Sequence, residues 1–113
     1  MDLYRRENAS LLVRSLGASP KIRIIDFLLD NPLLDFTKKE IMEVLGMSKK
    51  TLYRALPDLE EQGIVMVSRK IGRAKLYKIN LQHPLVKALR EHEKRLSLQE
   101  AEKGRAKEAT IIP

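Results

Sequence analysis

The chain has 113 residues, of which 43% are hydrophobic and 33% charged, with a net charge of +7 and an isoelectric point near 9.8. This length predicts one domain with a modest hydrophobic core. The absence of cysteine excludes disulfides and thiolate chemistry, and no apolar run reaches the roughly 18 residues of a membrane span. The first residues lack the apolar segment of a signal peptide, so we expect a cytoplasmic protein.

The positive charge is concentrated in the middle of the chain. Residues 1–36 hold five basic and five acidic side chains, whereas residues 37–82 hold ten basic and five acidic ones. Residues 83–113 hold seven basic and five acidic side chains. A local basic excess of this kind is the electrostatic footprint expected of a nucleic-acid-binding surface.

The first part of the chain predicts two helices. Residues 4–16 read as a short amphipathic helix, which could close the core or join a partner chain. Ser19 and Pro20 are typical of the N-cap and first residue of a second helix over residues 21–30, which should end before Pro32. Because this second helix is apolar on nearly all sides, we expect it in the centre of the domain.

The stretch from residue 37 to residue 63 predicts two short helices joined by a tight turn. Thr37 and Glu40 have the spacing of a capping box at the start of the first helix, and Gly46 should end it. Ser48 is the expected N-cap of the second helix. Four residues at helical spacing should form the buried side of that second helix: Leu52, Ala55, Leu56 and Leu59.

This second helix has an unfavourable order of charges. It opens with two basic residues and ends with three acidic ones: Lys49, Lys50, Asp58, Glu60 and Glu61. The helix dipole favours the reverse order by roughly 0.3–1 kcal/mol for each exposed charge, and a local rule broken in this way often marks a functional surface. Backbone N–H groups and lysines at a helix start suit an anion, and we expect nucleic-acid phosphate there rather than solvent alone.

A basic β-hairpin is predicted after the two helices. Residues 64–70 and 75–80 are short enough for strands, and Gly72 allows a tight turn between them. Tyr77 and Ile79 share one face of the second strand, so we expect that strand to be half buried. The segment holds five basic side chains and no acidic one: Arg69, Lys70, Arg73, Lys75 and Lys78. A tip with this charge excludes a hydrophobic interface, so the alternatives are a phosphate-binding turn and a solvated one.

The last predicted helix begins with Pro84 at its first position. Four of its residues form a stripe that we expect to mediate dimerisation: Leu85, Leu89, His92 and Leu96. The apolar spacing fails after Leu98. We therefore expect residues 1–98 to form the domain and residues 99–113 to be a frayed or disordered tail.

The order of helix, helix, turn, basic-ended helix and basic hairpin resembles the winged helix-turn-helix. Residues 47–80 resemble the small bacterial and archaeal transcription regulators of the ArsR and MarR type, through Ser48-x-x-Thr51, Leu52-Tyr53-Arg54, Leu59-Glu60-x-x-Gly63 and Gly72-Arg73. The resemblance covers roughly residues 19–96. It implies an α+β fold with a three-helix core, a two-stranded wing over residues 69–75, a recognition helix over residues 49–62 and a flanking C-terminal helix.

Two features depart from the family pattern. Pro57 lies inside the recognition helix, where it removes the hydrogen bond to the Tyr53 carbonyl and should bend the helix beyond its first two turns. Metal-sensing regulators of the ArsR type use cysteine or histidine–carboxylate sets, whereas this chain offers only His83 and His92, a poor ligand set. We therefore expect no metal or cofactor, and no small-molecule ligand is identifiable.

Side chains off the buried stripe are the candidates for DNA contact. Arg54 can reach both acceptors of guanine, and Tyr53 can contact phosphate, sugar or a thymine methyl, or else be a partly packed aromatic. Arg73 at the wing tip is expected to reach the minor groove or its phosphates. The complete predicted set is Lys38, Lys39, Ser48, Lys49, Lys50, Thr51, Tyr53, Arg54, Arg69, Lys70, Arg73 and Lys75.

The sequence therefore predicts a homodimeric, nucleoid-associated regulator of transcription that binds double-stranded DNA sequence-specifically. An enzyme is not expected, because no glycine-rich nucleotide loop or nucleophile motif is present. Two alternatives remain open: an architectural or plasmid-partition protein that spreads along DNA, and a winged-helix module that docks another protein. The basic wing favours DNA, since a protein-docking surface needs exposed apolar anchors.

Overall fold

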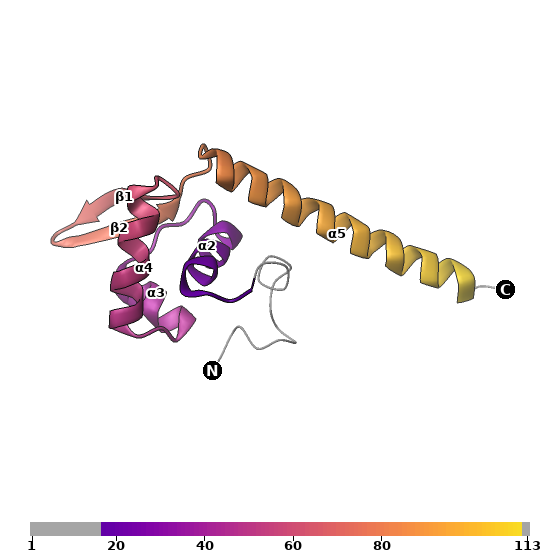
Figure 1. Cartoon of the computed structure of the whole chain (residues 1–113), viewed down its shortest axis with the longest axis horizontal. Helices are drawn as coiled ribbons and strands as arrows, with labels where there is room; N and C mark the ends of the chain where they lie inside the picture. Colours follow the sequence, from indigo (N-terminus) through magenta and orange to yellow (C-terminus); the bar gives the residue numbers. More distant parts are fainter. Residues whose placement is uncertain (1–16, 112–113) are drawn as a thin grey trace.

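The computed structural model describes residues 17–111 of the chain. Their elements are α2 (Pro20–Asp30), α3 (Lys38–Leu45), α4 (Lys49–Glu61), β1 (Val65–Ile71), β2 (Ala74–Ile79) and α5 (Pro84–Ile111). The helix expected over residues 4–16 lies outside the described residues. This is the α+β fold that the sequence predicts, with a helical core, a hairpin on one side and α5 extending from the other (Figure 1). None of the helices described has the length and apolar character needed to cross a membrane.

Helix α2 forms the centre of the core, as its apolar character predicts. The Ser19 side chain accepts the Ile22 N–H at its start, and Asn31 ends it. The helix contacts α3, α4 and β2, because its buried residues lie on several sides: Ile24, Ile25, Asp26, Leu28 and Leu29. Its position at the centre explains why α3 and α4 are held at fixed places around it.

The predicted caps are present at both helices of the helix-turn-helix. The Thr37 hydroxyl accepts the Glu40 N–H at 3.1 Å and the Glu40 carboxylate accepts the Thr37 N–H at 3.0 Å, which completes the capping box. Gly46 ends α3 with φ of 60°, a left-handed conformation that would strain other residues. Ser48 Oγ accepts the Thr51 N–H at 3.1 Å. These local bonds fix the residue at which α4 begins.

Helix α4 buries one apolar stripe and exposes the opposite side. Leu52 and Leu56 are fully buried, and Ala55 and Leu59 nearly so. The helix continues through the exposed Pro57 to Glu61, so the proline does not end it. The first two turns of α4 precede Pro57 and keep their backbone hydrogen bonds, because a proline removes only its own N–H.

Strands β1 and β2 form an antiparallel hairpin, in which each strand lies about one residue from its predicted bounds. Gly72, with φ of 61°, and Arg73 form the two-residue turn between the paired residues Ile71 and Ala74. The face that carries Tyr77 and Ile79 is buried, as predicted. An isolated bridge from the segment before α3 pairs with β2, through two backbone hydrogen bonds between Phe36 and Tyr77, and this bridge joins the hairpin to α3.

Helix α5 begins at Pro84, as predicted, and leads away from the core (Figure 1). Val86 is fully buried and Leu89 packs against the core, which anchors the first turns. The helix continues to Ile111, past residue 98 where the sequence suggests that order ends. Residues 99–109 are rich in Ala, Glu, Gln, Lys and Arg, which favour helix without any apolar spacing. The division of the chain at residue 98 stays a prediction.

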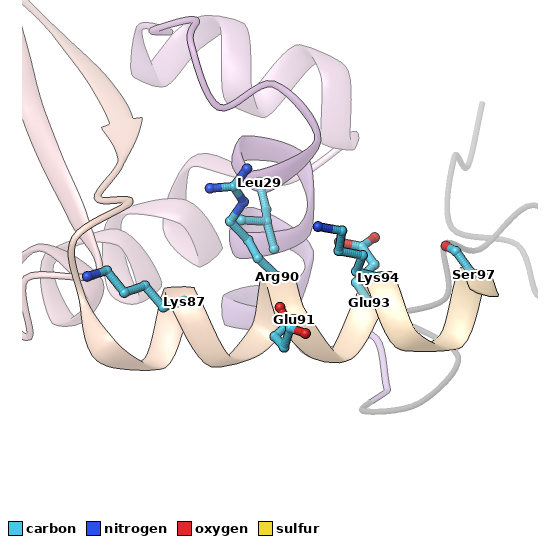
Figure 2. A pocket seen from close by; sticks show the side chains of 7 residues that line it. All are labelled: Leu29, Lys87, Arg90, Glu91, Glu93, Lys94 and Ser97. Atoms are coloured by element: carbon cyan, nitrogen blue, oxygen red, sulfur yellow. The ribbon is translucent and has the colours of Figure 1, made fainter. Parts of the chain in front are cut away.

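A hollow of about 500 Å³ lies where α5 passes α2 (Figure 2). Its lining consists of Leu29, Lys87, Arg90, Glu91, Glu93, Lys94 and Ser97. Carboxylate oxygens of Asp26, Asp30 and Glu93 lie within 4.8 Å of one another beside it. Burial, and then the charges of Asp30 and Asp26, raise the pKa of Glu93. The ionised form of Glu93 therefore weakens the α2–α5 contact above the ordinary glutamate pKa of about 4.3.

Candidate nucleic-acid interface

The outward side of α4 carries the basic residues that the sequence singles out. Lys49, Lys50, Tyr53 and Arg54 are all exposed, opposite the buried leucines. Within residues 17–111, Lys50 and Arg54 form no ion pair. Their positive charge is therefore available to a partner outside the chain.

The hydroxyl groups at the start of α4 have a structural role. Ser48 Oγ accepts the Thr51 N–H, and its own proton is donated to Thr51 Oγ1 at 2.9 Å. Ser48 thus uses both of these bonds to cap α4, while the Thr51 hydroxyl keeps its proton as a donor. The structure places both residues at the predicted interface and gives Ser48 a capping function in addition.

The acidic end of α4 is partly compensated by another helix. Asp58 forms an ion pair with Lys21 of α2, with a distance of 3.1 Å between Nζ and Oδ2. Both side chains are about half exposed, so the pair adds little stability. It nevertheless gives Asp58, which is unfavourably placed for the helix dipole, a positive partner. Lys49 and Lys50 at the other end have no acidic partner in the described part of the chain.

Tyr53 lies between lysines from two different helices. Lys38 Nζ of α3 is 4.4 Å from the centroid of the Tyr53 ring, and Lys49 Nζ of α4 is 5.2 Å from it. These distances are within the range of cation–π attraction. The Tyr53 side chain is 46% exposed, which is consistent both with a DNA contact and with the partly packed aromatic that was the structural alternative.

An open groove of about 370 Å³ separates the start of α3 and Tyr53 from the hairpin. We call this the basic groove; its lining consists of Thr37, Lys38, Lys39, Tyr53, Arg73, Ala74, Lys75 and Tyr77. Five residues of the predicted DNA-contacting set thus meet at one place, although they come from three different elements.

Two hairpin lysines face each other across the strands. Lys70 and Lys75 are directly paired in the register, and both are exposed. Like charges at such a position are destabilising, and no acidic side chain pairs with either lysine within residues 17–111. A bound anion would relieve the repulsion between the two lysines, so this unfavourable pair is typical of an anion-binding surface.

Comparison with known proteins identifies the fold. Residues 19–67 match the family described as bacterial regulatory protein, arsR family. The chain is a winged helix-turn-helix protein. In this fold α3 and α4 are the two helices of the helix-turn-helix and the hairpin is the wing; we call α4 the recognition helix, after the role that the sequence predicts for it. Curated protein sequences give no match to the chain.

Several solved structures have the same fold. Reduced HlyU from Vibrio cholerae is 26% identical, with 75% of this chain and 83% of HlyU covered and a TM-score of 0.56. MepR, a transcription regulator of the Staphylococcus aureus multidrug efflux pump MepA, is 15% identical, with 89% and 82% covered and a TM-score of 0.58. A ZitR variant from Lactococcus lactis in complex with DNA is 20% identical, with 72% and 57% covered and a TM-score of 0.51.

Arg69 forms an ion pair within the fold, unlike the other cations of the wing. Its Nε donates to Asp35 Oδ2 at 2.9 Å and its Nη2 to Asp35 Oδ1 at 3.3 Å, while Ser68 Oγ also donates to Asp35. The hydrogen bonds from Arg69 and Ser68 hold the pKa of Asp35 below its usual value. Arg69 therefore anchors the wing to the segment before α3, although the sequence suggests a DNA contact for it.

The structure adds three residues that the sequence did not point to. Asp35 receives Arg69, Lys21 binds Asp58, and Tyr77 lines the basic groove. A second hollow, of about 450 Å³, places Thr51 and Arg54 of the recognition helix beside Ser19, Pro20 and Lys21 at the start of α2. The predicted DNA-contacting residues therefore lie in two places. Five of them line the basic groove on the wing side of the recognition helix, and Thr51 and Arg54 lie on its α2 side.

The predicted dimerisation stripe is only partly covered within residues 17–111, by the packing of Leu89 against the core. Leu85 is 44% exposed and His92 is exposed, whereas Leu89 and Leu96 are half-buried. Val86, one residue from Leu85, faces the core instead. The first turns of α5 therefore have one side in the core and another open to a second chain.

We expect Asp35→Asn to lower the free energy of unfolding at neutral pH, because it removes the negative charge and one of the two carboxylate oxygens that hold Arg69. The pKa of Asp35 is lower in the folded chain than the value of about 3.9 in the unfolded chain. The stabilisation is therefore complete above the unfolded value and is lost as the pH falls through the folded value. Urea denaturation of wild type and variant between pH 3 and pH 7 measures this.

Arg69→Gln is the matched variant and should give the same pH profile, and the double variant should lose no more than either single one. A stability difference that is constant over the whole pH range would contradict the role given to this pair, as would no difference at pH 7.

Proposed function

We propose that the chain is a DNA-binding regulator of transcription that acts as a homodimer. In this proposal the recognition helix enters the major groove, and the wing lies on the adjacent backbone or minor groove. The observation that carries it is the gathering of cations from α3 and the wing in the basic groove, beside a recognition helix whose own lysines and arginine are exposed; within residues 17–111 none of these groove cations has an acidic partner. Phosphate contacts of this kind position a protein on a duplex, and base contacts then provide sequence specificity.

Arg54 is the residue to which we assign base reading. It is exposed on the second turn of α4, before Pro57, and has no acidic partner in the described part of the chain. Its planar guanidinium can donate to both acceptors of guanine in the major groove. Lys49 and Lys50 at the helix start are better suited to phosphate, since an ammonium group acts as a point charge without a fork.

The dimer rests on α5. Its stripe begins on the first turns, where Leu85 is exposed and Leu89 packs against the core, and continues along the helix to Leu96. A two-fold dimer would present two recognition helices about one helical turn of DNA apart, roughly 34 Å. This spacing is the geometric reason to expect two half-sites in the bound DNA.

Arg54→Ala and Arg73→Ala should affect DNA binding differently. We expect Arg54→Ala to cost about 1–3 kcal/mol on a duplex selected from a random library and much less on a scrambled duplex. Arg73→Ala should weaken both duplexes by a similar factor and reduce the salt slope by about one for each subunit. Titrations of both variants at two salt concentrations measure this. An equal loss on both duplexes for Arg54→Ala would mean that Arg54 holds phosphate and does not read bases.

The double variant Leu85→Glu and Leu96→Glu should convert the protein to a folded monomer, because it places charge on the α5 stripe that we assign to the interface. Lys94→Glu is the control, since Lys94 lies half a turn around the helix from Leu85, beside the α2 hollow. Analytical ultracentrifugation measures the oligomeric state. A dimer that survives the double variant, or a wild-type monomer, would contradict this assignment.

A further inference from the structure

We infer that the basic groove is a binding site for one backbone phosphate of the DNA, and that Tyr53 is a positioning residue that holds Lys38 in it. The inference rests on the proposed function, because the phosphate belongs to the bound duplex. It adds to the proposed function a role for Tyr53, which acts on DNA binding through the side chain of Lys38. Arg54, to which we assign base reading, does not line this groove.

The position of Lys38 is set by an aromatic face and not by an acid. Lys38 is half-buried, and its Nζ lies 4.4 Å from the Tyr53 centroid and 5.9 Å from the Tyr77 centroid. A ring face attracts the ammonium group without using up its N–H donors as a carboxylate would. The ammonium group is therefore both restrained and free to donate to an anion in the groove.

The surroundings of Lys38 favour an anion with several oxygens. Of the described residues that line the groove, none is acidic, and four are basic: Lys38, Lys39, Arg73 and Lys75. The start of α3 adds the positive end of its dipole. Cations stand on both walls, one wall belonging to the helix-turn-helix and the other to the wing. A phosphate between them would join the two DNA-contacting parts of the fold.

The Tyr77 hydroxyl offers one more donor. Tyr77 is only 2% exposed but lines the groove, and within residues 17–111 its hydroxyl has no hydrogen-bond partner. The oxygen itself is not among the enclosed atoms that lack a partner, so it is open to the groove. Burial, followed by the nearby Glu60 and Tyr53, raises the pKa of Tyr77, so the hydroxyl keeps its proton at neutral pH. An anion in the groove would give it an acceptor.

The test is a double-mutant cycle between Lys38 and Tyr53, measured as duplex affinity of the full chain between 50 and 200 mM salt. The slope of log affinity against log salt is negative, and Lys38→Gln should reduce its magnitude by about 0.9 for each subunit, the value for one phosphate contact. Tyr53→Leu, which removes the ring face, should lower it by a similar amount. The double variant should be no weaker than Lys38→Gln alone, and Tyr53→Phe, which keeps the ring, should retain the wild-type slope.

Lys39→Gln is the matched control, because Lys39 lines the same groove but is not held over a ring. Its effect should add to that of Tyr53→Leu. Tyr77→Phe should weaken binding roughly three- to tenfold without changing the slope, since it removes one neutral donor to a charged acceptor. An additive Lys38–Tyr53 cycle would overturn the inference, as would a Tyr53→Phe variant with the reduced slope of Tyr53→Leu.

Failure of this inference can be told apart from failure of the proposed function. A wild-type protein that binds duplex with strong salt dependence, together with an additive cycle, removes only the role of Tyr53 and the groove. A wild-type protein that does not bind duplex at all removes both. Thermal denaturation of each variant reports folding, and Lys38→Gln tests the groove independently if Tyr53→Leu fails to fold.

Discussion

The packing of the apolar stripe of α4 against α2 determines where the candidate DNA-contacting side chains point. Because Leu52, Ala55 and Leu56 are buried on one side of the helix, Tyr53 and Arg54 between them face outward. The Ser48 cap fixes the first residue of the helix, and therefore the register of the whole exposed side. A helix with the same sequence but without this packing would have no defined face to present to DNA.

The wing depends on a second constraint, the pairing of Arg69 with Asp35. The hairpin extends from the core (Figure 1), and its base is held by this ion pair and by the bridge between Phe36 and Tyr77. One basic residue of the wing is thus used to orient the others. Lys70 and Lys75 remain as an unfavourable like-charge pair, which an external anion would relieve. Arg69 is neutralised by Asp35 and has a structural role, whereas Lys70 and Lys75 keep charges that can bind an anion.

Local patterns in the sequence were sufficient for the fold. The capping box at Thr37, the glycine at Gly46 and the apolar stripe of α4 each act within a few residues, so their spacing alone predicts the helix boundaries. The central position of α2 follows in the same way from its apolar surface. Even Pro57, which departs from the pattern, leaves the first two turns of the recognition helix unaffected.

Contacts between distant parts of the chain could not be predicted in this way. The pairs Arg69–Asp35 and Lys21–Asp58, and the stacking of Lys38 on Tyr53, join residues far apart in the sequence. Such partners are known only once the helices are placed. For this reason the sequence assigned Arg69 only a role in DNA contact and did not anticipate its ion pair with Asp35, and it gave no sign that Tyr77 lines the basic groove.

The central claim is that this winged helix-turn-helix recognises a specific DNA sequence. The most direct measurement is a nuclease-protection footprint of the full chain on genomic DNA from its source. We expect a short protected site that contains two half-sites about one helical turn apart and does not grow as the protein concentration rises. Continuous protection that spreads along the duplex with concentration would contradict sequence-specific regulation and would identify a protein that coats DNA.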